Sequence, residues 1–283
     1  MKLSKGFIYT FLSAFAWAIS IIIVRMLLNA GINAYQVSFW TVIFAIPFWL
    51  LVLLNKSKEL KNLSRNTVCI LLCLGIIYAA INIVEIFALK YSQAMNFSFI
   101  NRTVILFTIV LAWIFLGEKL TLKKNILALL IIIGSYLLIT KAQSLSLTLG
   151  DSFTLLEAFL IGISNILAKV SVTRTSPLLT GSAVFLISVI PTGVVAHINN
   201  GITFPESSFL LMIIAFSYIV LNIFRYKALK LASASYVTMV FSFTPVLVAL
   251  MAIPLLGESL IPIQILGGFL IILAGILVEK LKI

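Results

Sequence analysis

Polar side chains recur inside long apolar stretches of this sequence, at spacings that place them on common helix faces. Residues three, four or seven positions apart lie on one side of an α-helix. Tyr78, Asn82 and Glu85 share such a face, and the equivalent face of a later stretch has Tyr218, Asn222 and Arg225. Applied to every stretch, this criterion predicts the residues that line a cavity for a small polar molecule: Trp17, Ser20, Tyr78, Asn82, Glu85, Ser98, Arg102, Glu157, Ser164, Tyr218, Asn222, Thr238 and Ser242.

Arg102 is the charge that lies deepest in any apolar stretch. It stands about nine residues into the stretch 93–116, which at ~1.5 Å per residue is ~14 Å deep, near the middle of a bilayer. A charge there costs roughly 2.5–3.5 kcal/mol on insertion scales. Two interpretations remain open: Arg102 binds the anionic group of a substrate, or it pairs with Glu85 or Glu157. Because the stretches hold four cations and two carboxylates, we expect a carboxylate or phosphate on the substrate.

The other charges inside the stretches allow two further expectations. Arg25, Lys169 and Arg225 lie nearer the ends of their stretches, where long side chains reach the interface. Glu85 and Glu157 are the two carboxylates inside the stretches, so proton coupling through an intramembrane acid would use one of them. Whether the protein couples to protons at all stays open.

Acidic residues beside the stretch ends are interpreted as structural. Glu118, Glu258 and Asp151 each lie next to a predicted helix end, where a carboxylate can accept hydrogen bonds from free backbone N–H groups. Cys69 and Cys73 lie four apart within one apolar stretch and match no metal-binding motif. We therefore expect no metal site, no catalytic residue and no cofactor.

Composition identifies the environment of the chain. Of 283 residues, 62% are hydrophobic and 10% charged, where soluble domains carry roughly 25% charged residues. This composition excludes a soluble enzyme, a disordered chain and a nucleic-acid-binding domain, and makes the lipid bilayer the main partner. Ten stretches are long enough to cross a membrane as helices, and too long and uniform for barrel strands: 6–28, 34–54, 67–89, 93–116, 121–140, 151–172, 177–198, 207–229, 232–256 and 261–280.

Loop charges predict the orientation in the membrane. Segments on the side of the N-terminus carry fourteen Lys and Arg residues, whereas segments on the other side carry Lys90 and Lys141 alone. Because positive loops stay in the cytoplasm, we expect both termini and the loop 55–66 there, and the loop 141–150 outside. The protein would then be a multi-pass protein of the cytoplasmic membrane.

The second half of the chain repeats the first. Shifted by 140 residues, 75–137 aligns with 215–277 without a gap, and sixteen of sixty-three positions are identical. Each copy, 1–141 and 149–283, holds five spans, and this odd number makes the second copy enter the membrane from the opposite side. The predicted fold is a single all-α integral membrane domain of ten transmembrane helices, an inverted five-plus-five repeat around a central cavity. Such repeats are typical of secondary transporters.

Several short motifs occur together along the chain: Leu-Gly-Glu at 116–118 and 256–258, Trp17, Gly150-Asp151 and Thr244-Pro245. With the ten spans and the repeat, they resemble the drug/metabolite transporter superfamily, EamA type. The sequence departs from that pattern at Val104-Ile105, where the second half has Thr244-Pro245, and at Ala18 and Trp40. The resemblance implies a metabolite carrier, often an exporter, with a cavity lined by spans 1, 3, 4, 6, 8 and 9.

The favoured function is secondary transport of a small metabolite, an amino acid or another small organic anion or zwitterion, by alternating access and in the export direction. A lipid-linked sugar or nucleotide-sugar carrier is the alternative. A membrane-embedded enzyme and a channel rank below both, because the sequence holds no H-E-x-x-H, G-x-S-x-G, Asp-rich or P-loop motif, and inverted repeats favour carriers. The partners expected are the substrate and the bilayer; the oligomeric state is left open.

Overall fold

The computed structural model describes residues 3–92, 94–143, 148–205, 207–257 and 259–282 of the chain. This part of the chain is helical throughout and has no strands. Its elements, in order, are α1 Lys5–Asn29, α2 Ala34–Asn55, α3 Ser57–Lys61, α4 Arg65–Tyr91, α5 Ala94–Ile100, the 3-10 segment η1 Asn101–Thr103, α6 Val104–Leu116, α7 Leu122–Thr140, α8 Leu149–Arg174, α9 Pro177–Ile198, α10 Ser208–Leu231, α11 Ala234–Phe241, α12 Thr244–Leu256 and α13 Pro262–Leu281.

Ten segments of the described chain are long and apolar enough to cross a membrane, which confirms the spans predicted from the sequence. The fourth span consists of α5, η1 and α6, and the ninth of α11 and α12. Both spans break at equivalent positions, although only the second break has a proline nearby. At each break a threonine hydroxyl donates to the carbonyl three residues earlier, Thr103 to Ile100 and Thr244 to Phe241.

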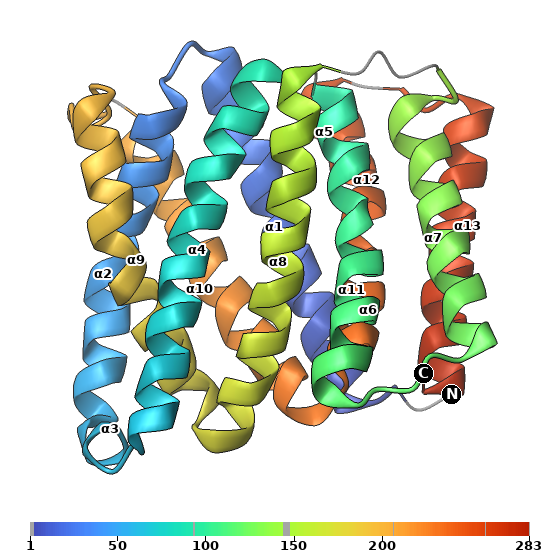
Figure 1. The fold of residues 1–283 in the computed structure, drawn as a ribbon. Helices are drawn as coiled ribbons and strands as arrows, with labels where there is room; N and C mark the ends of the chain where they lie inside the picture. Colours follow the sequence, from blue (N-terminus) through green and yellow to red (C-terminus); the bar gives the residue numbers. More distant parts are fainter. Residues whose placement is uncertain (1–2, 93, 144–147, 206, 258, 283) are drawn as a thin grey trace.

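The two halves exchange partners in the packing. Helix α1 packs along α10, and α8, the first helix of the second half, packs along α4. Helices α2 and α9 pack on each other, as do α7 and α13. In Figure 1, α1 starts at the lower edge, near the labelled N- and C-termini, whereas α8 starts at the upper edge. This exchange of partners and reversal of direction is the arrangement expected of two inverted copies.

Glycine contacts follow the same exchange. Gly6, at the start of α1, crosses the turn between α10 and α11, where a Cβ would lie 3.3 Å from the Cβ of Ala232. Gly150, at the start of α8, crosses the turn between α4 and α5, where a Cβ would overlap the backbone of Ser92. Each half therefore begins with a glycine that lets its first helix approach the other half.

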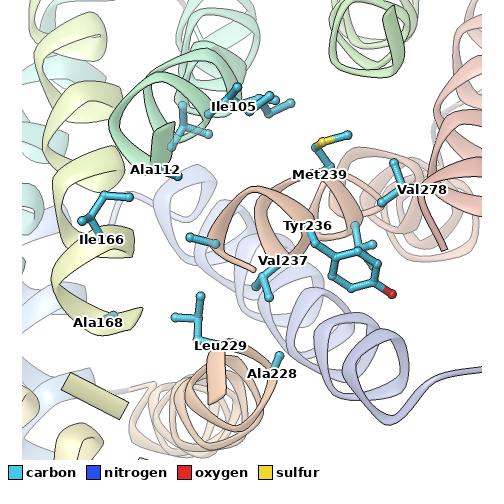
Figure 2. Close-up of a cluster of buried hydrophobic side chains, with 14 of the residues drawn as sticks. Ile105, Ala112, Ile166, Ala168, Ala228, Leu229, Tyr236, Val237, Met239 and Val278 are labelled. Atoms are coloured by element: carbon cyan, nitrogen blue, oxygen red, sulfur yellow. The ribbon is translucent and has the colours of Figure 1, made fainter. Parts of the chain in front are cut away.

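The apolar core lies around the broken helices. Figure 2 shows side chains of α6, α8, α10, α11 and α13 meeting in one buried cluster. Many large apolar residues instead face outward, among them Leu122, which is 75% exposed, and Phe209, which is 71% exposed. An outer surface of this kind suits lipid rather than water.

Candidate functional site

A cavity of about 130 Å³ lies between the two halves, lined by both. It is smaller than the roughly 300–1,000 Å³ typical of pockets for drug-sized ligands. Ten of the thirteen residues selected from the sequence line it: Trp17, Tyr78, Asn82, Glu85, Arg102, Glu157, Tyr218, Asn222, Thr238 and Ser242. They come from α1, α4, η1, α8, α10 and α11 with its C-cap, which belong to spans 1, 3, 4, 6, 8 and 9.

Three serines selected from the sequence do not line the cavity. Ser20 is buried and donates its hydroxyl hydrogen to the carbonyl of Trp17 in its own helix. Ser98 precedes the 3-10 segment η1, whose tighter winding ends the regular helical spacing that placed it beside Arg102. Ser164 is buried outside the lining, because the cavity face of α8 runs through Asn165 instead.

Two polar lining residues were missed by the sequence analysis, and the role of a third was left open. Asn165 lies eight residues after Glu157 and continues its face, so a strict spacing of seven chose the wrong neighbour. Asn101 lies beside Arg102 and enters the lining because η1 winds more tightly than an α-helix. Arg225 lines the cavity on the face that its spacing from Tyr218 and Asn222 predicts.

Arg102 and Glu157 are joined through the side chain of Asn101. The Asn101 amide donates to Glu157 Oε1 at 3.1 Å, and its oxygen accepts from Arg102 Nη2 at 3.3 Å. The exposed fractions of Asn101, Arg102 and Glu157 are 4%, 8% and 3%. The guanidinium also lies over the Trp17 ring, 5.7 Å from its centroid, a cation–π contact. The expected alternative of a direct Arg102–Glu157 ion pair is therefore not what the described residues form.

A second polar group lies around Asn165. Arg225 Nη2 donates to Asn165 Oδ1 at 2.6 Å. The amide of Asn165 in turn donates to Thr108 Oγ1 at 3.1 Å and to Thr238 Oγ1 at 3.2 Å. Because four helices, α6, α8, α10 and α11, contribute to this network, it fixes the position of the Arg225 guanidinium at the cavity wall.

Charges in the cavity balance. Within the described chain, its charged lining residues are Arg102, Arg225, Glu85 and Glu157. Glu85 and Arg225 occupy repeat-related positions with opposite charge. Lys169 does not line the cavity, and its Nζ donates to two backbone carbonyls at the C-terminal end of α10, of Leu229 at 2.6 Å and Ala232 at 2.8 Å. The four basic and two acidic residues counted inside the stretches therefore do not all lie at the cavity, whose lining holds two of each kind within the described chain.

Charged side chains also hold turns at the ends of helices that line the cavity. Glu118 accepts from the backbone N–H of Ala234 at 2.7 Å and from Ser235 Oγ at 2.5 Å, and so caps α11 of the other half. Lys124 lies 3.5 Å from the same carboxylate. The predicted capping role of Glu118 is confirmed, although the helix it caps is not the next one along the chain. Glu258, its counterpart, lies outside the described residues.

Asp151 has the predicted capping role at the start of α8. Its carboxylate accepts from the Thr148 backbone N–H at 2.6 Å, which closes a capping box. It also accepts from Ser92 Oγ at 2.5 Å and from Asn96 Nδ2 at 3.1 Å, and so reaches the turn between α4 and α5. In the described part of the chain, no three His, Cys, Asp or Glu side chains lie together as a metal site would require.

The fold and the cavity define a multi-pass membrane protein with a small polar chamber between two related halves. A family model for the EamA-like transporter family matches residues 4–140 and 148–279, and the chain belongs to this family. Among curated proteins, no significant match exists. A solved structure described only as "Crystal structure of protein" is similar in fold, with a TM-score of 0.82 and 12% identity, over 99% of this chain and 98% of that one.

Proposed function

We propose that the protein is a secondary transporter that moves a small organic anion or zwitterion, such as an amino acid, out of the cell by alternating access. One observation carries this proposal: a cavity between the two halves, lined by repeat-related helices, contains four charged side chains within the described chain. Charges in a membrane interior are costly unless they serve a ligand, an ion or each other. Transporters built from inverted repeats bind substrate at this place.

The geometry supports a role for Arg102 in substrate binding. Its Nε is buried without a hydrogen-bond partner in the described structure, and a guanidinium can bind a carboxylate through two parallel hydrogen bonds. Substrate bound there would lie between the halves, and closing one half on the other would expose it to the opposite side. The small volume favours a metabolite over the alternative nucleotide-sugar or lipid-linked sugar.

Counterflow in proteoliposomes tests this function. The purified protein is reconstituted with a panel of amino acids, organic acids and sugars, and exchange is measured against substrate concentration. We expect saturable exchange of at least one charged metabolite, weakened about tenfold by Arg102→Lys and more by Arg102→Ala, both folded. A rate that stays linear with concentration would indicate a channel, and altered product would indicate an enzyme. If Arg102→Ala combined with Glu157→Gln transports like wild type, Arg102 is only structural.

Orientation and coupling are part of the same proposal. We place both termini in the cytoplasm of a cell bounded by the cytoplasmic membrane. Cysteine labelling of intact cells should succeed at Ser144, which lies outside the described residues, and fail at Ser57; the reverse pattern contradicts the topology. If a pH gradient drives transport, Glu85→Gln or Glu157→Gln should abolish that drive; if both variants keep full gradient-driven transport, coupling does not use an intramembrane acid.

A further inference from the structure

We infer that Asn101 is a specificity-determining residue, which holds Arg102 and Glu157 apart as a two-point site for a zwitterion. Arg102 binds the carboxylate of the substrate, and Glu157 binds its ammonium group. The inference rests on the transport function proposed above and narrows its substrate class from anions and zwitterions to zwitterions.

The first argument is the chemistry of the spacer. A carboxamide donates from its nitrogen and accepts at its oxygen, so one side chain can hydrogen-bond a carboxylate and a guanidinium at once. Asn101 does both, at 3.1 Å to Glu157 and 3.3 Å to Arg102. An aspartate here could not donate to Glu157, and a leucine could neither donate nor accept. Without the spacer, the two charges would be free to pair directly and leave less capacity for a substrate.

The second argument is the hydrogen-bonding capacity that remains. Arg102 Nε and Glu157 Oε2 are both buried and have no partner in the described structure. Both residues line the cavity and are more than nine-tenths buried. Buried polar atoms of native proteins are nearly always hydrogen-bonded, so an unpartnered donor and an unpartnered acceptor in one small cavity indicate a ligand with one group of each kind.

The third argument is electrostatic. The cavity lining has two basic and two acidic side chains in the described chain, so a substrate with one acidic and one basic group keeps their numbers matched. An anion without an amino group could bind Arg102, but would bring a second negative charge near Glu157 and leave Oε2 without a donor. The repeat-related positions of Asn101, Arg102 and Glu157 are Phe241, Ser242 and Ser13. The two-point site is therefore a property of one side of the cavity.

Matched compounds test this inference in proteoliposomes. Three sets are used, built on alanine, leucine and phenylalanine, each with the amino acid, its deaminated acid and its decarboxylated amine. We expect at least one amino acid to exchange about tenfold better than its own acid and amine. If an acid exchanges as well as its amino acid, or if the broad panel finds only substrates that are not zwitterions, this inference fails and transport stands. If nothing exchanges in either panel, both proposals fail.

Variants separate a role in specificity from a role in folding. Glu157→Gln should bring the ratio of amino acid to acid exchange down about tenfold, because it removes the partner of the ammonium group. Asn101→Asp should lower amino acid exchange about tenfold, because the new carboxylate pairs with Arg102. Asn125→Asp, the same change at an exposed position of α7, is the matched control. An unchanged ratio in Glu157→Gln overturns the inference even if Asn101→Asp fails to fold.

Discussion

Two helix turns on opposite edges of the molecule differ in how closely a glycine of the other half packs on them. Two charged side chains bind the backbone of the turn between α10 and α11. Lys169 donates to carbonyls at the end of α10, and Glu118 accepts from the first N–H groups of α11. At the turn between α4 and α5, the side chains of Ser92 and Asn96 donate hydrogen bonds to Asp151. The backbone of this turn packs directly against Gly150. In Figure 1 the first turn lies at the lower edge and the second at the upper edge.

Polar contacts and close glycine packing at such turns respond differently to substitution. A cation at a helix C-terminus and an anion at a helix N-terminus both match the helix dipole. Breaking such hydrogen bonds costs free energy, but the bonds can form again after the helices have moved apart and returned. Close backbone packing through a glycine depends instead on an accurate fit of the two surfaces. We therefore expect variants at the α10–α11 turn to act through lost hydrogen bonds, and variants at the α4–α5 turn to act through overlap.

The largest effect is expected for Glu118→Ala. Its side chain is 12% exposed and that of Lys124, its partner, is 7% exposed. Removing one partner of a buried charged pair costs about 3–5 kcal/mol, and the variant also leaves the first N–H groups of α11 uncapped. The melting temperature in detergent should therefore fall clearly. Glu118→Gln keeps one acceptor oxygen, so its melting temperature should lie between those of the wild type and Glu118→Ala. An alanine variant that melts like wild type would mean that Glu118 does not fasten this turn.

A smaller loss is expected for Lys169→Met. The side chain keeps its length but no longer donates to Leu229 and Ala232, and hydrogen bonds to charged groups are worth about 1.5–3 kcal/mol. Lys169→Arg should recover most of the stability because arginine also donates. Lys123→Met, at an exposed position of α7, serves as the control in the same melting experiment. Equal melting of the two methionine variants would contradict the role given to Lys169.

A matched pair of glycines sharpens the comparison. Gly150→Ala places a methyl group against the backbone of Ser92, and overpacking of this kind costs about 1–3 kcal/mol. Gly6→Ala places its methyl 3.3 Å from the Cβ of Ala232, where a small shift suffices. The melting temperature should therefore fall for Gly150→Ala and change little for Gly6→Ala. If both glycines respond alike, the two turns do not differ in packing as described.

The sequence was sufficient to predict the ten spans, because helix length and hydropathy follow directly from the thickness of a bilayer. It also located most of the cavity lining, since polar groups avoid lipid and reveal their face by spacing. It failed at Asn101, because the helix winds irregularly in η1. It also failed at Asn165, because a shift of one residue along α8 separates the cavity-lining Asn165 from the predicted Ser164.

Partners far apart in the chain were the other limit. The sequence places Lys169 near a span end but does not show that the carbonyls of Leu229 and Ala232 lie within its reach. In the same way, Glu118 was recognisable as a cap, whereas the capped helix begins 116 residues further on, at Ala234. Contacts between the halves depend on how the helices pack, and single-helix periodicity carries no information on that packing.

In alternating access, α1 has to move away from the α10–α11 turn. A reversible disulfide between the two shows whether transport needs this movement. A Cβ at Gly6 would lie 3.3 Å from the Cβ of Ala232. The two Cβ atoms of a disulfide lie about 3.5–4.5 Å apart, so these positions are suited to a cross-link. The variant Gly6→Cys with Ala232→Cys is prepared with Cys69 and Cys73 replaced by serine, and counterflow is measured after oxidation and again after reduction. We expect oxidation to stop exchange and reduction to restore it, whereas each single-cysteine variant should be unaffected. Undiminished exchange by the oxidised, fully cross-linked protein would contradict a carrier that opens by parting these helices.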